Sequence, residues 1–137
     1  MAYQTRVLFV CVANAARSQL AEALLRHTDP NNFAAFSAGS APSAIDPRTL
    51  AALQQLGVDT QGLRSKSLDE LRFDEFEYVI SLYDKSAEEC QHLEFSGEQL
   101  TWNFADPVTS DNPDAFRHCL HEIHERIKMF VLVKTKR

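Results

Sequence analysis

Short apolar runs alternate with helical stripes along this chain. Apolar runs over residues 6–12, 33–38 and 78–83 indicate buried strands, and a shorter run over residues 100–104 indicates a fourth. Between and after them, the spacing of apolar positions predicts helices over residues 18–27, 46–57 and 85–92, and a last helix that opens at Asn112-Pro113. Because strands and helices alternate, the chain is predicted to have an α/β fold with a parallel sheet and helices on both faces.

The last predicted helix has the clearest pattern. One face carries an apolar stripe, which consists of Phe116, Leu120, Ile123, Ile127 and Phe130. Cys119 flanks this stripe and is expected to pack in the core as a small apolar side chain. Helical geometry places His118, His121 and His124 on the other side, where a solvated face is expected rather than a metal site.

Composition narrows the class of protein. The chain has 137 residues, enough for one domain over residues 1–137, and its 45% hydrophobic and 24% charged residues are typical of a soluble globular protein. A net charge of −5 gives no support for nucleic-acid binding, and no apolar run reaches membrane-spanning length. Three cysteines, an odd number, argue against a secreted disulfide framework, so a cytoplasmic location is expected.

The most informative segment joins the first strand to the first helix. The strand ends on Cys11, and after a short loop Arg17 and Ser18 open the helix. Unpaired backbone N–H groups and the positive end of the helix converge there, which makes an anion site and favours the nucleophilic thiolate. Arg17 offers a planar pair of donors that matches two oxygens of phosphate or arsenate. The segment therefore predicts nucleophilic attack by Cys11 on a tetrahedral oxyanion.

With these features the chain resembles the low-molecular-weight protein tyrosine phosphatase superfamily, and most closely its arsenate reductase branch. The resemblance covers nearly the whole chain, through residues 11–23, 37–39, 56–59, 64–67, 78–82 and 102–107. It implies a single-domain three-layer sandwich, with a four-stranded parallel sheet in the order 2-1-3-4 and helices on both faces.

The resemblance also implies a role for each residue of the site. Cys11 is the expected nucleophile, Arg17 holds the oxyanion, Ser18 stabilises the thiolate, and Asp106 is the general acid that protonates the leaving oxygen. The remaining residues of the loop are expected to bind the oxyanion or to shape the loop, and they are Val12, Ala13, Asn14, Ala15 and Ala16. No cofactor and no metal are expected.

The loop has no glycine, although this family usually has one where Ala13 stands. A loop that turns its N–H groups inward commonly needs one residue with a left-handed backbone. Asparagine tolerates that conformation better than most residues. We therefore predict that Asn14 adopts it and shapes the loop rather than reacting.

Two further departures leave the second chemical step open. Arsenate reductases coupled to thioredoxin use two more cysteines, whereas this chain has Cys90 and, in place of the other, Tyr83, which cannot exchange disulfides. Either Cys90 or an external thiol such as glutaredoxin, thioredoxin or a small thiol would then complete the reduction. The tyrosine phosphatases usually have tyrosines where residues 108–110 read Val-Thr-Ser, and a second loop cysteine where Ala16 stands.

The sequence thus favours an arsenate reductase-like enzyme that acts on a small oxyanion. The alternative is a low-molecular-weight tyrosine phosphatase, which would hydrolyse phosphotyrosine in a protein through a cysteinyl-phosphate intermediate. A silent oxyanion-binding module is a third hypothesis. Cys11 and Asp106 favour an enzyme, because a binding module needs neither a thiolate nor an acid.

Overall fold

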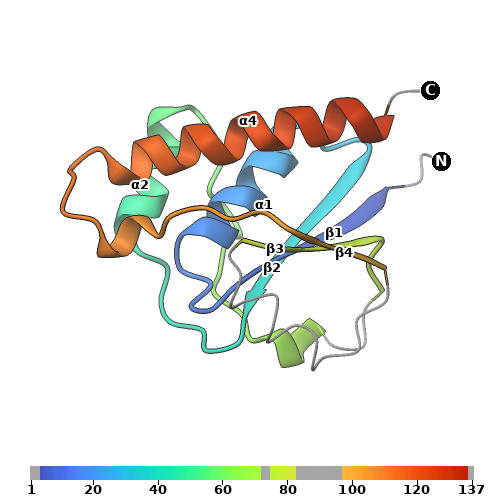
Figure 1. The fold of residues 1–137 in the computed structure, drawn as a ribbon, viewed down its shortest axis with the longest axis horizontal. Helices are drawn as coiled ribbons and strands as arrows, with labels where there is room; N and C mark the ends of the chain where they lie inside the picture. Colours follow the sequence, from blue (N-terminus) through green and yellow to red (C-terminus); the bar gives the residue numbers. More distant parts are fainter. Residues whose placement is uncertain (1–3, 72–74, 83–96, 136–137) are drawn as a thin grey trace.

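The described strands and α-helices follow one another in the predicted order, with two short 3₁₀ helices that the sequence did not predict (Figure 1). The computed structural model describes residues 4–71, 75–82 and 97–135. Its helices and strands are β1 (Thr5–Cys11), α1 (Arg17–Thr28), β2 (Phe33–Gly39), α2 (Pro47–Gln55), the 3₁₀ helix η1 (Leu68–Leu71), β3 (Tyr78–Ser81), β4 (Glu98–Thr101), the 3₁₀ helix η2 (Pro107–Thr109) and α4 (Ala115–Thr135). The helix expected over residues 85–92, together with Tyr83 and Cys90, lies outside the described residues.

Four parallel strands form one sheet in the order β2-β1-β3-β4, which confirms the predicted α/β class and strand order. The central strand β1 pairs on both sides, so it must be apolar on both faces. Val7 to Val10 are accordingly buried throughout. Since the strands are parallel, their carboxyl ends meet at one edge of the sheet, and β1 ends there on Cys11.

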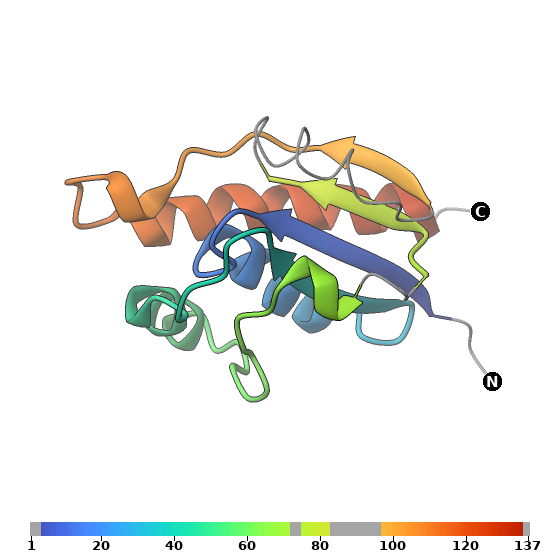
Figure 2. The same ribbon diagram turned by 90° about the horizontal axis from the view of Figure 1, so that it is seen from below.

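The two faces of the sheet are covered differently. Val7 and Phe9 of β1 face a core that includes residues of α1 and α4, whereas Leu8 and Val10 face a smaller cluster that includes Leu68 of η1. Figure 1 shows α1, α2 and α4 above the sheet and η1 below it. Figure 2 shows the loop after β1, α2 and η2 gathered at one end of the sheet, away from the N-terminus. That end holds the predicted site.

The predicted helix faces are largely confirmed. All five residues of the α4 stripe are buried, and Cys119 packs among them. His118 and His121 are exposed as expected, but His124 is partly buried, and this burial lowers the pKa of its imidazole. The part of the chain that the structure describes contains no group of three or more His, Cys, Asp or Glu placed to hold a metal ion, and no helix long and apolar enough to cross a membrane.

All four strands differ from their predicted bounds, and among them β2 ends at Gly39 and β3 at Ser81. β1 ends at Cys11 rather than at residue 12, because the carbonyl of Val12 turns away from the sheet to accept a hydrogen bond from Ala41 N–H. β4 begins at Glu98, two residues earlier than expected, and ends at Thr101. β4 pairs on one side only and three of its four residues are exposed. Its hydrophobic pattern is therefore too weak to predict where the strand begins and ends.

The end of β2 lies directly against the loop after β1. A Cβ atom on Gly39 would come within 2.8 Å of the Cys11 carbonyl oxygen and 2.9 Å of Asn14 N, and closer still to the Val12 carbonyl oxygen. All three neighbours are backbone atoms, which cannot move aside without deforming the loop. Only glycine therefore allows this approach of strand and loop.

We expect Gly39→Ala to destabilise the protein by about 1–3 kcal/mol and to weaken phosphate binding, because the loop must shift to admit the methyl group. Urea unfolding and phosphate titration measure the two effects. Gly57→Ala is the matched control, since Gly57 has a φ of 82° and nothing within 4 Å of the added Cβ. It should lower stability through backbone strain alone and leave phosphate affinity unchanged. Unchanged phosphate affinity in Gly39→Ala would contradict this account.

Candidate active site

Cys11 lies at the base of a cleft of about 670 Å³ at the carboxyl edge of the sheet. The loop after β1 forms one wall, and the segment that leads into α2 forms another. Asp106 and Val108 line the cleft from a third segment, distant in sequence. The structure therefore places the predicted nucleophile, arginine and acid around one cleft.

The carbonyl groups of the loop after β1 are all engaged in hydrogen bonds. Five consecutive carbonyl groups, those of residues 12–16, accept hydrogen bonds. The carbonyls of Val12 and Ala13 accept from the backbone N–H groups of Ala41 and Ser43, and that of Asn14 accepts from the Gln19 side chain. The Ala15 carbonyl accepts from Asp46 N–H and the Thr49 hydroxyl, and the Ala16 carbonyl accepts from Leu20 N–H. The described peptide bonds are all trans, so the N–H groups of residues 13–17 point the opposite way from these carbonyl groups. A loop whose consecutive N–H groups are left free of its own carbonyls in this way can bind an anion.

Asn14 shapes the loop from behind. Its φ is 51°, and it is the single residue other than glycine with positive φ among the described residues, as the sequence predicts. The side chain is fully buried, and its Oδ1 accepts hydrogen bonds from the backbone N–H of Lys66 at 2.7 Å and from Gln19 Nε2 at 3.0 Å. Unlike its neighbours in the loop, Asn14 does not line the cleft.

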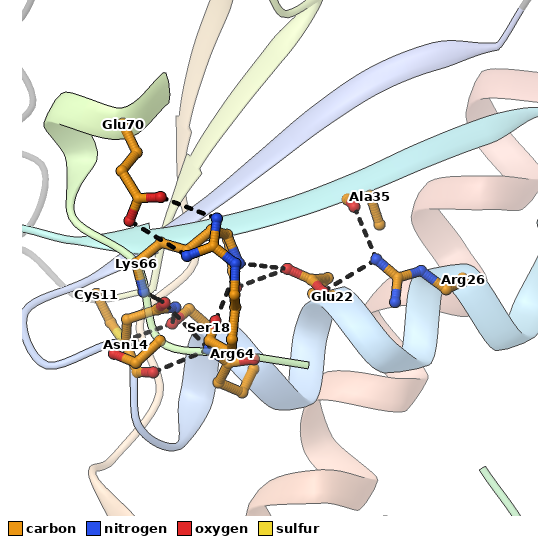
Figure 3. Close-up of polar contacts among 12 residues, drawn as sticks. Cys11, Asn14, Ser18, Glu22, Arg26, Ala35, Arg64, Lys66 and Glu70 are labelled. Carbon is orange, nitrogen blue, oxygen red and sulfur yellow. Dashed lines mark hydrogen bonds and ion pairs between the residues drawn. The ribbon is translucent and has the colours of Figure 1, made fainter. Parts of the chain in front are cut away.

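These contacts determine which way the Asn14 amide faces. A backbone N–H can only donate, so the Asn14 atom that faces Lys66 is the oxygen, and the amide nitrogen faces Ser18. That nitrogen donates to Ser18 Oγ at 2.7 Å, and Ser18 Oγ shares a hydrogen bond with Cys11 Sγ, 2.8 Å away. Because a thiolate has no proton to donate, Ser18 is the donor of this bond whenever Cys11 is ionised. Figure 3 shows this chain of contacts.

Arg17 is the first residue of α1 and connects the loop to the segment that carries Asp106. Its Nη1 donates to the carbonyl oxygen of Phe104 at 2.9 Å, and its Nη2 lies 3.7 Å from Asp106 Oδ2. Asp106 is itself held in place as the N-cap of η2, where Oδ1 accepts from Val108 N–H. Both side chains line the cleft, so a bound oxyanion would lie within reach of the guanidinium and the carboxyl group.

The structure also contains parts of the site that the sequence analysis missed. Asp46 and Pro47 were predicted only as a helix start, yet residues 43–47 line the cleft, and the backbone N–H groups of Ser43 and Asp46 donate to loop carbonyls. Gln19 and Lys66, which hold Asn14, lie in segments that carry the family resemblance, but the sequence analysis gave neither a role. Their place in those segments was the signal that could have marked them.

Comparison with known proteins identifies the family. The family model for low molecular weight phosphotyrosine protein phosphatases matches residues 6–137. An arsenate reductase of Halalkalibacterium halodurans is 27% identical over 129 residues, which cover 90% of this chain and 93% of that protein. The arsenate reductase of Archaeoglobus fulgidus has a crystal structure that superposes with a TM-score of 0.78 at 30% identity, covering 91% of this chain and 98% of that one.

A tyrosine phosphatase of Erwinia amylovora shares the fold, with a TM-score of 0.84 at 20% identity over 98% of this chain and 95% of that one. The resemblance noted in the sequence is therefore confirmed by both the family model and the structures. The chain belongs to the low molecular weight phosphotyrosine protein phosphatase family and is an enzyme of that family.

Proposed function

We propose that this enzyme reduces arsenate, with Cys11 as the nucleophile. The observation that carries the proposal is the lining of the cleft: none of the described residues around it has an aromatic ring that could stack on a phosphotyrosine side chain. The likeness to arsenate reductases over 90% of the chain supports the same substrate.

The first step joins Cys11 to the oxyanion. The Sγ thiolate attacks arsenic, a bond forms between sulfur and arsenic, and one arsenate oxygen leaves as water. Asp106 donates the proton that this leaving oxygen needs. Arg17 and the loop N–H groups hold the remaining oxygens throughout. Asp106 and Arg17 line the same cleft as Cys11, which supports these roles.

The second step must supply two electrons. A second thiolate attacks the Cys11 sulfur, a disulfide forms, and the electron pair of the sulfur–arsenic bond remains on arsenic, which leaves as arsenite. An external thiol then reduces the disulfide. We propose Cys90 or an external thiol, such as glutaredoxin, thioredoxin or a small thiol, as the attacking group.

Cys119 is unsuited to this second step. Only 3% of it is exposed, and burial raises the pKa of its thiol to about 12. A thiol with so high a pKa is almost entirely protonated at neutral pH, and the protonated form does not attack disulfides or arsenic–sulfur bonds. Its place is in the core between α4 and its neighbours.

One observation favours tyrosine phosphatase activity as the second candidate function. The cleft, at about 670 Å³, has room for an organic group beyond a bare oxyanion, and Val108 and Ile45 give it apolar walls. In that reaction Cys11 would attack phosphorus, tyrosine would leave with the proton of Asp106, and water would hydrolyse the cysteinyl-phosphate.

Parallel assays separate the two functions. We expect arsenate reduction in the presence of an external thiol, with thioredoxin, glutaredoxin and glutathione supplied separately, and slower hydrolysis of p-nitrophenyl phosphate. Cys11→Ser should abolish both reactions, since a serine hydroxyl is a far weaker nucleophile than a thiolate. Cys119→Ala, at the buried cysteine that the mechanism does not use, is the matched control and should leave both reactions in place. Either reaction surviving in Cys11→Ser would disprove the mechanism, and hydrolysis without arsenate reduction would establish the phosphatase.

Replacing the acid tests the role of Asp106. Asp106→Asn should lower kcat for phenyl phosphate by about 10²–10⁴, the usual contribution of a general acid. For p-nitrophenyl phosphate the loss should be much smaller, because that leaving group departs without a proton. The ratio of the two kcat values is the measurement. Asp114→Asn, on an exposed aspartate at the start of α4, should change neither. Equal losses for both esters would show that Asp106 only positions Arg17.

Alkylation tests the assignment of Cys119. In the folded protein at pH 8, iodoacetamide should modify Cys11 and leave Cys119 intact, because pH 8 lies well below its pKa of about 12. Peptide mass spectrometry measures the extent at each site. Urea should expose Cys119 and make it react. Rapid modification of Cys119 without urea would show that it is accessible and open to redox chemistry.

A further inference from the structure

Behind the loop lies a buried carboxylate, that of Glu22 on α1 (Figure 3). Only 2% of Glu22 is exposed. Its Oε1 accepts a hydrogen bond from Ser37 Oγ at 2.7 Å and lies 3.6 Å from Lys66 Nζ, and its Oε2 accepts from Arg26 Nη2 at 3.0 Å. Burying a charge lowers the stability of the folded protein unless hydrogen bonds and opposite charges compensate for the lost water. The cluster around Glu22 is therefore expected to have a specific role in the structure.

Lys66 connects this carboxylate to the catalytic loop. Its Nζ faces Glu22 and donates to the carbonyl oxygen of Arg64 at 3.0 Å, and 9% of the residue is exposed. The backbone N–H of the same residue donates to Asn14 Oδ1. Lys66 therefore holds the ion pair with its side chain and the loop with its main chain.

The whole segment from residue 64 to residue 66 lies between α1, the loop and β2. Gln19 Nε2 of α1 donates to the Arg64 carbonyl at 2.9 Å, and Ser65 Oγ donates to the Ala13 carbonyl at 3.4 Å. Gly39 N–H donates to the Lys66 carbonyl at 2.9 Å. The Lys66–Glu22 pair is the one ion pair among the described residues that ties this segment to α1.

We propose that the Lys66–Glu22 ion pair is a positioning pair for Cys11. By holding residues 64–66 against α1, it places the Lys66 N–H that orients the Asn14 amide. Asn14 in turn donates to Ser18 Oγ and so holds that hydroxyl against the sulfur. Lys66 and Glu22 contact neither the sulfur nor the cleft. They act only through the hydrogen bonds that run from Lys66 N–H through Asn14 and Ser18 to the sulfur.

The test is the rate at which Cys11 reacts. Lys66→Met keeps an unbranched side chain but removes the ammonium group, while Glu22 retains Ser37 and Arg26 as partners. We expect the rate of Cys11 alkylation by iodoacetamide at neutral pH to fall about tenfold, the equivalent of one hydrogen bond to a charged atom. The Cys11 peptide is quantified by mass spectrometry, so the other cysteines do not interfere. Lys66→Arg, which retains the charge, should recover part of the rate.

A control variant changes the same segment without touching the pair. Arg64 and Glu70 form an ion pair at 2.8 Å whose side chains are 63% and 44% exposed. Glu70→Gln removes this surface pair, which contributes little to stability. It should leave the alkylation rate of Cys11 unchanged. A loss of rate equal to that of Lys66→Met would show that any loosening of the segment has the same effect, and would overturn the proposal.

The double variant Glu22→Gln with Lys66→Met separates positioning from stability. Removing both charges relieves the cost of an incompletely paired buried carboxylate, so the midpoint of urea unfolding should recover relative to Lys66→Met. The alkylation rate should remain about tenfold low, because neither charge is left to hold residues 64–66. Recovery of rate and stability together, or a wild-type rate in folded Lys66→Met, would overturn the proposal.

The proposal rests on Cys11 as the nucleophile of the proposed function, but alkylation proceeds without arsenate or phosphate. If the enzyme proves to be a phosphatase, the positioning pair is unaffected. If the alkylation rates do not change as expected, the choice between arsenate and phosphotyrosine is equally unaffected. The two proposals therefore fail on different measurements.

Discussion

A loop that turns consecutive N–H groups toward an anion must turn its carbonyl groups away from it, and those carbonyl groups need donors of their own. The rest of this structure depends on that constraint. Residues 41–49 run along the outside of the loop and supply donors to the carbonyls of Val12, Ala13 and Ala15. Gln19 supplies the Asn14 carbonyl from the first turn of α1. The connection between β2 and α2 is thus part of the anion site.

The same constraint explains why the site has two layers. The inner layer faces the cleft and contains Cys11, Arg17 and Asp106. The outer layer consists of buried polar groups that never meet the substrate, among them Asn14 and Lys66. Lys66 N–H fixes the orientation of the Asn14 amide, the Asn14 amide donates to Ser18 Oγ, and Ser18 Oγ contacts the Cys11 sulfur. An inner layer without the outer one would contain the right residues in no defined orientation.

Local features were the ones that the sequence revealed. Cys11 at the end of an apolar run, Arg17 at a helix start and the missing glycine at Ala13 all lie within one segment. They led to the proposal of Cys11 as nucleophile and to the correct prediction of a left-handed Asn14. The buried face of α4 could also be predicted from the sequence, because the helical spacing of apolar residues indicates which face of a helix is buried. Asp106 was different. The chain has three Asp-Pro pairs, and the residues around them do not distinguish Asp106, the proposed general acid, from Asp46, which caps a helix.

The sequence by itself determined the α/β fold, the family and the left-handed conformation of Asn14 in the loop after β1. It did so because strand and helix periodicity and backbone preference are properties of neighbouring residues. Only the tertiary structure showed that Asp106 meets Arg17, which carbonyl groups residues 41–49 satisfy, and how Lys66 comes to hold Asn14. Those contacts join residues between about 30 and 90 positions apart, and no local pattern records which distant partner a buried polar group will find.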